Sequence, residues 1–261
     1  MLGEGRGSRV QIIVAIALVA LVAAGAIAFF MTRGGAPQSP TDVEALFERS
    51  AADRDAARAL KANFPDEYRQ LLQRVADASR ERGREAAVRE TSQFMERFIR
   101  SKANAIIAAP DRDLQRIGGG QVALIQALRD ENVNLCAQYA VRGLTPGTRL
   151  SPATLALLSR LSVVVIEAAR AGEQPGRRPR PTLSDDDGRA WISALRDIDP
   201  AVARQMESNT AISQPPAGQC RAGVVLYEAV TRLPAATAAN VTAFLVRESM
   251  NAPPPMPVVA R

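Results

Sequence analysis

The sequence predicts an all-α protein, in which one N-terminal transmembrane helix precedes an exported domain of about nine or ten helices. Apolar residues recur at helical spacing along most of the chain, and no alternating pattern typical of a β-strand runs for a useful length. Prolines and short polar residues stand where helices would begin. Of the 261 residues, 47% are hydrophobic and 23% are charged, which allows a real core and excludes a disordered or collagen-like chain.

The first element covers residues 10–31, a segment with no charged side chain. As a helix it would be about 33 Å long, close to the roughly 30 Å of a bilayer's hydrocarbon core. We therefore interpret residues 10–31 as a transmembrane anchor in contact with the lipid bilayer. Two arginines precede this segment and a single arginine follows it closely. The positive-inside rule then places residues 1–9 in the cytoplasm.

A cleaved signal peptide is the alternative interpretation of this segment. Ala24-Gly25-Ala26 and Ala26-Ile27-Ala28 both fit the small-x-small pattern that a signal peptidase reads. The apolar run nevertheless continues to Met31 and is longer than the usual apolar region of a signal peptide, which favours an uncleaved anchor. Both interpretations export the residues that follow.

Within the predicted anchor, Ala20, Ala24 and Ala28 form a row of small residues along one helix face. Such a row lets two membrane helices approach closely, so the anchor could support a homodimer. In an alanine-rich helix the same row also arises by chance.

The two cysteines, Cys136 and Cys220, are far apart and lack the CxxC spacing of a metal or redox site. In an oxidising compartment such a pair more often forms a disulfide than stays free, and the alternative is two unrelated buried thiols. A bond would close a loop of about 85 residues and favour a single exported domain. Arginine far outnumbers lysine and alanine is abundant, a bias that we associate with GC-rich bacterial genomes. We therefore expect a bacterial inner-membrane protein with its domain in the periplasm.

The exported domain is predicted to cover residues 41–250, after a short polar spacer at residues 32–40. Thr41 and Glu44 fit a T-x-x-E capping box that opens a first helix reaching Leu60.

A second helix is expected from Pro65, and an apolar side along residues 84–109 predicts a third. From Asp111 the helical period continues straight through residues 118–120, which are all glycine. A phosphate-binding loop would need a strand before these glycines and a Lys-Ser/Thr after them, and the chain has neither. We expect instead a helix in which glycine permits close packing of a neighbour or a kink.

The second half of the domain continues with further helices. A short helix ends near Gly143, and Ser151-Pro152 opens a long, buried helix that ends at Gly172. Residues 172–183, rich in proline, glycine and arginine, are predicted to form a flexible linker. Further helix starts are predicted at Ser184, Asp199-Pro200, Cys220 and Pro234. The proline-rich tail, residues 251–261, is expected to be disordered or extended.

The chain contains no histidine, which excludes a Ser-His-Asp or Cys-His apparatus and any His-ligated metal. Most carboxylates lie next to an arginine, as expected for a solvated, salt-bridged surface. Glu167 follows the apolar run Val163–Ile166 and is the one weak catalytic candidate, because burial there would suit an acid–base group. Asp185–Asp187 lack the spacing of a calcium loop and suit the first turn of a helix, so we predict no metal site and no cofactor.

The basic segment Arg177–Arg180 and the sequence pI near 10.1 raise the question of nucleic-acid binding. Aromatic residues make up only 4% of the chain and are scattered, so no stacking platform for single strands is visible. We therefore predict no nucleic-acid partner. Anionic lipid head groups, an acidic partner or plain solvation account better for these charges.

Two functional expectations follow. The first is a single-pass, membrane-anchored, exported protein that acts by binding, as an assembly component of a bacterial envelope complex with an envelope protein as partner and no catalysis of its own. The alternative is a carboxylate-dependent hydrolase of envelope polysaccharide. A deep groove with a second carboxylate facing Glu167 would favour the hydrolase, whereas a flat or apolar exposed patch would favour the binding protein.

Overall fold

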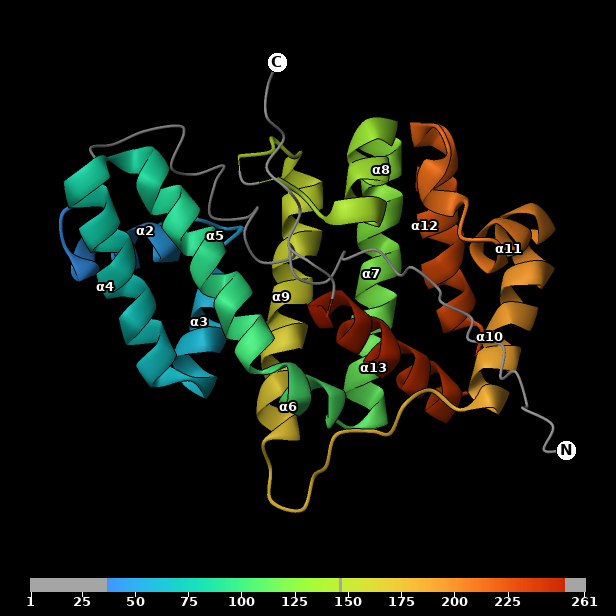
Figure 1. The fold of residues 1–261 in the computed structure, drawn as a ribbon. Helices are drawn as coiled ribbons and strands as arrows, with labels where there is room; N and C mark the ends of the chain where they lie inside the picture. The colour runs from blue at the N-terminus through green and yellow to red at the C-terminus, as the bar shows by residue number, and fades with distance from the viewer. Residues whose placement is uncertain (1–36, 146, 252–261) are drawn as a thin grey trace, which may run out of the picture.

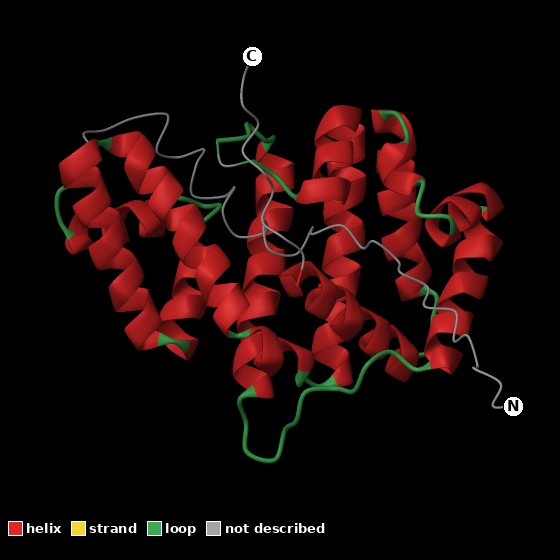
Figure 2. Ribbon diagram, in the orientation of Figure 1, coloured by secondary structure: helices red, strands yellow, loops and turns green. Residues whose placement is uncertain are grey.

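The structure is a computed structural model that describes residues 37–145 and 147–251, and this part of the chain is built from α-helices without a β-strand (Figures 1 and 2). The predicted all-α fold class is confirmed. The helices are α2 (Pro40–Arg49), α3 (Arg54–Asn63), α4 (Pro65–Arg82), α5 (Arg84–Ser101), α6 (Ala103–Ile107), α7 (Asp111–Glu131), α8 (Val133–Arg142), α9 (Pro152–Gly172), α10 (Asp185–Ile198), α11 (Pro200–Glu207), α12 (Pro216–Thr231) and α13 (Ala235–Asn251).

These twelve described α-helices exceed the expected nine or ten because two predicted helices are each divided in two. The helix expected from residue 41 to Leu60 ends at Arg49, and the hydroxyl of the next residue, Ser50, donates to the Asp53 carboxylate and accepts from the Asp53 backbone N–H at 3.2 Å. These local side-chain bonds compete with the backbone bonds of a continuous helix. The helix expected over residues 84–109 is interrupted at Lys102, between α5 and α6.

The first helix also begins earlier than expected. Ser39 is its N-cap, since its hydroxyl accepts from the Asp42 N–H at 3.2 Å and the Asp42 carboxylate accepts from the Ser39 N–H at 2.9 Å. The capping box is therefore Ser39 to Asp42, and the prediction of a box from Thr41 to Glu44 is wrong. Pro40 explains the difference, because proline favours the first helical position, where no backbone N–H is needed.

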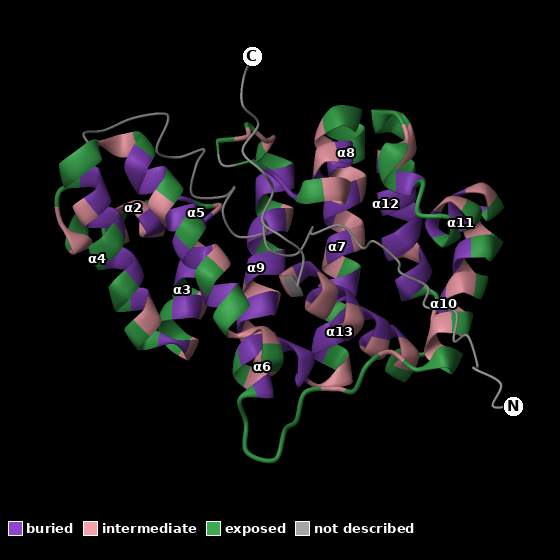
Figure 3. Ribbon diagram, in the orientation of Figure 1, coloured by how far each residue is buried: buried purple, intermediate pink, exposed green. Residues whose placement is uncertain are grey.

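Figure 1 shows α2–α5 at one end of the molecule and α10–α12 at the other, with α7 and α9 between them. Helices α3 and α6 pack against α9, and α13 packs against α6 and α7. Buried residues run through all of these helices and form one contiguous core (Figure 3). The α2–α5 end is thus a corner of a larger core.

Lys102 links the α2–α5 end of the molecule to the end of α9 through ion pairs. Its ammonium lies 3.0 Å from Glu67 of α4 and 2.8 Å from Glu173, just after α9, and it stands 4.6 Å from the centre of the Phe64 ring. Burial opposes this charge, but the hydrogen bonds to Glu173 and Glu67 outweigh the burial and raise the pKa of Lys102. The point at which the predicted third helix breaks is therefore held by contacts with distant helices.

Helix α7 runs unbroken through its three glycines, as predicted. A Cβ on Gly118 would meet the Thr242 hydroxyl of α13 at 3.3 Å, and one on Gly120 would meet Leu161 of α9 at 2.9 Å. Gly119 faces open space. Close packing of neighbouring helices therefore accounts for two of the three glycines.

Cys136 of α8 and Cys220 of α12 form the predicted disulfide, with Sγ atoms 1.97 Å apart and Cα atoms 5.1 Å apart. Both cysteines are buried. Helix α12 also approaches α8 so closely that a Cβ on Gly223 would lie 2.5 Å from the Ala140 Cβ. The bond and this packing join the chain before the 173–184 loop to the chain after it.

Within the described residues, α9 is the one helix long and apolar enough to cross a membrane, and 56% of its apolar window is buried among other helices. The sequence-based interpretation of α9 as a buried core helix fits this burial. Several predicted features lie outside the described residues: the cytoplasmic residues 1–9, the anchor at residues 10–31 with Ala20, Ala24 and Ala28, most of the 32–40 spacer, and nearly all of the 251–261 tail.

Candidate functional site

A pocket between α2, α3, α4 and α5 combines an apolar wall with a single buried acid. Its interior has about 40 Å³ of space for water-sized groups, and the total rises to about 350 Å³ when the adjoining open solvent is counted. The lining residues are Phe47, Asp53, Ala56, Ala57, Leu60, Leu71, Thr91 and Met95. A mostly apolar pocket with a few polar groups is typical of a binding site for a small group.

Among the described residues that line this wall, Asp53 is the only one with an ionisable side chain. It is 9% exposed, and its carboxylate accepts a hydrogen bond from the Ser50 hydroxyl. Burial raises the pKa of Asp53 to about 6, and the hydrogen bond from Ser50 offsets only part of that rise. A buried carboxylate with a raised pKa in a pocket is a candidate functional group.

Two other aspartates in the described part of the chain are similarly buried, and both have an arginine beside them. Asp113 lies 3.5 Å from Arg116, and Asp199 lies 2.5 Å from Arg221. Asp199 also caps α11, because its carboxylate accepts from backbone N–H groups of the first turn. Asp53 precedes α3 in the same way, yet its side chain makes no capping hydrogen bond. Within the described residues, its carboxylate thus belongs to neither an ion pair nor a helix cap.

The other polar atoms near Asp53 offer hydrogen-bond acceptors. The Thr91 hydroxyl donates to the Ala87 carbonyl at 3.0 Å, which leaves its oxygen lone pairs for the pocket. The Ser50 hydroxyl already donates to Asp53, and the Met95 thioether is a weak acceptor. A ligand in this pocket would therefore have to supply the donors.

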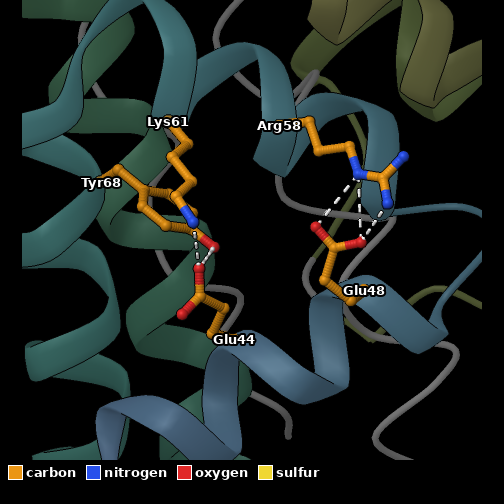
Figure 4. A network of polar contacts seen from close by, with 5 residues as sticks. All are labelled: Glu44, Glu48, Arg58, Lys61 and Tyr68. Carbon is orange, nitrogen blue, oxygen red and sulfur yellow. Dashed lines mark hydrogen bonds and ion pairs between the residues drawn. The ribbon is translucent and has the colours of Figure 1, made fainter.

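Polar contacts on the outside hold α2 against α3 and α4 (Figure 4). The guanidinium of Arg58 donates to Glu48, with Nε 3.1 Å and Nη2 2.6 Å from the nearest carboxylate oxygens. Glu44 lies 2.8 Å from the Lys61 ammonium and accepts from the Tyr68 hydroxyl at 3.4 Å. Burial, and then the nearby Glu44 charge, raises the pKa of Tyr68 and keeps its phenol protonated as a donor. Exposed pairs of this kind contribute at most about 1 kcal/mol each, and they link three of the pocket's four helices, α2, α3 and α4.

Glu167, the sequence-based catalytic candidate, lies apart from this pocket on α9. Its side chain is 42% exposed, and its carboxylate is 2.9 Å from the Arg116 guanidinium of α7. Arg116 also lies 3.5 Å from Asp113, so a cation stands between the two carboxylates. A glycosidase pair needs space for the sugar between its carboxyl groups, whereas this arrangement is typical of a surface ion pair.

The acidic run Asp185–Asp187 forms the first turn of α10, as predicted. The Ser184 hydroxyl accepts from the Asp187 N–H at 3.1 Å, and the Asp187 carboxylate accepts from Asn240 of α13 at 3.0 Å. These acids stabilise the helix start. Among the described residues, no group of three or more Cys, Asp or Glu side chains is placed to hold a metal ion.

The basic loop between α9 and α10 is only partly solvated. Arg177 and Arg178 are exposed. Arg180 pairs with Asp111 at the start of α7 and donates to Asn240 of α13 at 2.9 Å. Arg247 of α13 in turn donates to the Arg180 carbonyl at 2.5 Å. The end of the predicted linker therefore lies against the core helices.

A second hollow lies between α8, α11 and α12. Its wall is mostly apolar and includes Met206, Tyr227 and the exposed Ile212. It contains no carboxylate and no basic side chain. This hollow lacks the charge that would select a ligand.

Helical periodicity does not single out Asp53, because it predicts one long helix ending at Leu60 with this residue inside it. A signal was nevertheless present, since Ser50 and Asp53 have the S-x-x-D spacing that favours a helix start. A break at this position brings the acid into the wall of the pocket.

The chain matches no protein-family model, no curated protein and no solved structure. A function for it is therefore inferred from its own residues.

Proposed function

We propose that the chain is a single-pass, membrane-anchored binding or assembly protein of a bacterial envelope complex, with its helical domain in the periplasm and no catalysis of its own. The observation that carries this proposal is the disulfide between Cys136 and Cys220 in the core of the domain. Disulfides persist in oxidising compartments such as the periplasm and are rare in the cytosol. An exported domain accounts for the bond.

The sequence before the domain supports attachment to the inner membrane. Residues 10–31 have the length and apolar character of a membrane-spanning helix, and the arginines before them favour a cytoplasmic N-terminus. Helix α2 begins at Pro40, only a short spacer later. The pocket formed by α2–α5 would therefore lie close to the membrane surface and could meet a partner there.

The side-chain arrangement supports binding over hydrolysis. The pocket holds one carboxylate, Asp53, rather than the pair that glycoside cleavage requires. Glu167, the other candidate, is engaged by Arg116. A pocket with an apolar wall and one charge suits recognition of a partner group.

Reporter fusions test the compartment. A reporter enzyme that is active only outside the cytoplasm, fused after Arg261, should be active in bacteria that express the full chain. The matched control lacks residues 1–31 and should leave the reporter inactive. An inactive reporter on the full chain would contradict the proposal, and recovery of a mature form that begins near Phe29 would replace the anchor with a cleaved signal peptide.

Crosslinking in intact membranes tests the binding role. The full chain should crosslink reproducibly to an envelope protein, and Glu167→Gln should leave the crosslinked species unchanged because this carboxylate is only a surface ion-pair partner. Polysaccharide hydrolysis by the purified chain that disappears in Glu167→Gln would instead establish the hydrolase.

A further inference from the structure

We propose that the Asp53 pocket binds an aliphatic primary ammonium, a short alkyl chain that ends in a protonated amine. The inference deepens the proposed binding function and rests on it. It depends on three properties of the pocket: an uncompensated negative charge, a set of acceptors without free donors, and an apolar wall drawn from four helices.

The pocket presents a negative charge that has no cation beside it among the described residues. Asp53 is buried without a cation beside it, whereas Asp113 and Asp199 each have an arginine. The neighbouring Arg54 does not fill this role, since only burial and the hydrogen bond from Ser50 act on the pKa of Asp53. A buried carboxylate is costly without a counter-charge, and a cationic ligand would supply one.

The hydrogen-bonding groups of the pocket favour an ammonium over other cations. A guanidinium prefers both oxygens of a carboxylate, and one oxygen of Asp53 is already engaged by Ser50. A divalent metal ion needs several oxygen ligands, and this wall holds a single carboxylate. An ammonium is a compact charge with three donors, which the free Asp53 oxygen and the Thr91 hydroxyl oxygen could accept.

The apolar wall of the pocket suits an alkyl chain. Phe47, Leu60, Leu71 and Met95 come from α2, α3, α4 and α5, and each is buried. A chain of methylene groups would pack against these side chains while its ammonium stays at Asp53. A lysine side chain of a partner and a free alkylamine share this chemistry.

The test uses the full chain in detergent, labelled with ¹³C at the methionine methyl groups. Met95 lines the Asp53 pocket and Met206 lines the second hollow, so one spectrum reports both places. We expect n-pentylammonium to shift the Met95 signal in a saturable way and to leave Met206 unchanged. The neutral analogue 1-pentanol should bind at least tenfold more weakly, because a hydrogen bond between charged groups contributes about 1.5–3 kcal/mol.

Variants establish that the carboxylate is responsible. Asp53→Asn should weaken binding of n-pentylammonium at least tenfold, whereas Asp55→Asn, which changes an exposed carboxylate in the first turn of α3, should leave it unchanged. Ala56→Leu keeps the carboxylate but fills the pocket, and it should also abolish the Met95 shift. This second variant decides the question if Asp53→Asn fails to fold.

Binding should also depend on pH. An acid with a pKa of about 6 is mostly ionised at pH 7 and mostly protonated at pH 5, so the affinity for n-pentylammonium should fall about tenfold between these values. A shift of Met95 that persists in Asp53→Asn, or that 1-pentanol reproduces at equal concentration, would overturn the proposal.

A lysine amide capped at both ends, used in place of n-pentylammonium, separates the two sources of the ligand. Binding of the capped lysine supports a partner's lysine side chain, and binding of the free amine alone supports a small-molecule ligand. These spectra are independent of the reporter fusions, so failure of ammonium binding and failure of export are distinguished.

Discussion

Replacing Asp53 by asparagine should stabilise the protein at neutral pH and have little such effect in acid. Asparagine has nearly the same shape and can still accept from the Ser50 hydroxyl, but it carries no charge. In the folded protein the pKa of Asp53 is raised from 3.8 to about 6, so the folded state holds the proton more tightly than the unfolded chain does. The protonated Asp53 carboxyl therefore contributes fully to the free energy of unfolding below about pH 4, and this contribution is lost as the pH rises through 6.

The magnitude follows from the shift. A rise of about two pKa units corresponds to about 3 kcal/mol of unfolding free energy, which the wild type lacks above pH 6 and the variant keeps. The 9% exposure of Asp53 leaves little solvent to screen this cost. For a domain of this size, about 3 kcal/mol corresponds to an increase of roughly 6–12 °C in Tm.

Thermal unfolding of the full chain in detergent at pH 3, 5 and 7.5 measures this effect. The quantity of interest is the Tm of Asp53→Asn minus that of the wild type, because the other carboxylates titrate in both proteins and cancel. The difference should grow from pH 3 to pH 7.5. Asp55→Asn removes an exposed charge from the first turn of α3, two residues after Asp53, and should show no comparable growth. A Tm difference for Asp53→Asn that stays constant with pH would refute the assignment of a raised pKa to Asp53.

Two further predictions concern packing. Changing both Cys136 and Cys220 to serine should lower the unfolding free energy by about 2–5 kcal/mol in urea titrations, since the bond spans 84 residues of sequence. Unchanged stability would show that the bond does not constrain the unfolded chain. Gly172→Ala should lower the unfolding free energy by about 3 kcal/mol or more, because its Cβ would lie 1.7 Å from the Ala105 carbonyl oxygen. Gly119→Ala, in open space on α7, should raise the unfolding free energy by about 1 kcal/mol. Equal Tm shifts for the two glycine variants would contradict this packing.

Much of the fold was predictable because apolar residues recur at helical spacing in the sequence of an amphipathic helix. The continuity of α7 through its glycines and the pairing of Cys136 with Cys220 followed from spacing and composition. The helix breaks at Ser50 and Lys102 could not be predicted in this way. At Ser50, two local side-chain bonds with Asp53 accompany a backbone turn, and at Lys102 the side chain is held by glutamates from distant parts of the chain. A hydrophobic pattern averaged over several turns does not record either event.

The candidate site was less predictable than the fold for a related reason. Asp53 becomes a pocket residue only when four helices meet around it, and that meeting depends on packing between distant segments. Glu167 shows the converse error, because an apolar run before it suggested burial while the ion pair with Arg116 keeps it at the surface. Periodicity predicts the side of a helix that is buried, but it does not predict which charged residue at its border lacks a partner.

The energetic cost of Asp53 is itself evidence about function. Net stabilities of domains are about 5–15 kcal/mol, so an uncompensated carboxylate costing about 3 kcal/mol is a substantial burden. The turn at Ser50 does not require the charge, because an asparagine could accept the same hydrogen bond. A cationic ligand at Asp53 would offset the cost and lower the pKa of this acid, so binding and stability should change in opposite directions in Asp53→Asn. If Asp53→Asn is more stable at neutral pH and no longer binds n-pentylammonium, the buried charge of Asp53 accounts for both effects. A variant that gains stability and still binds would place the ligand elsewhere.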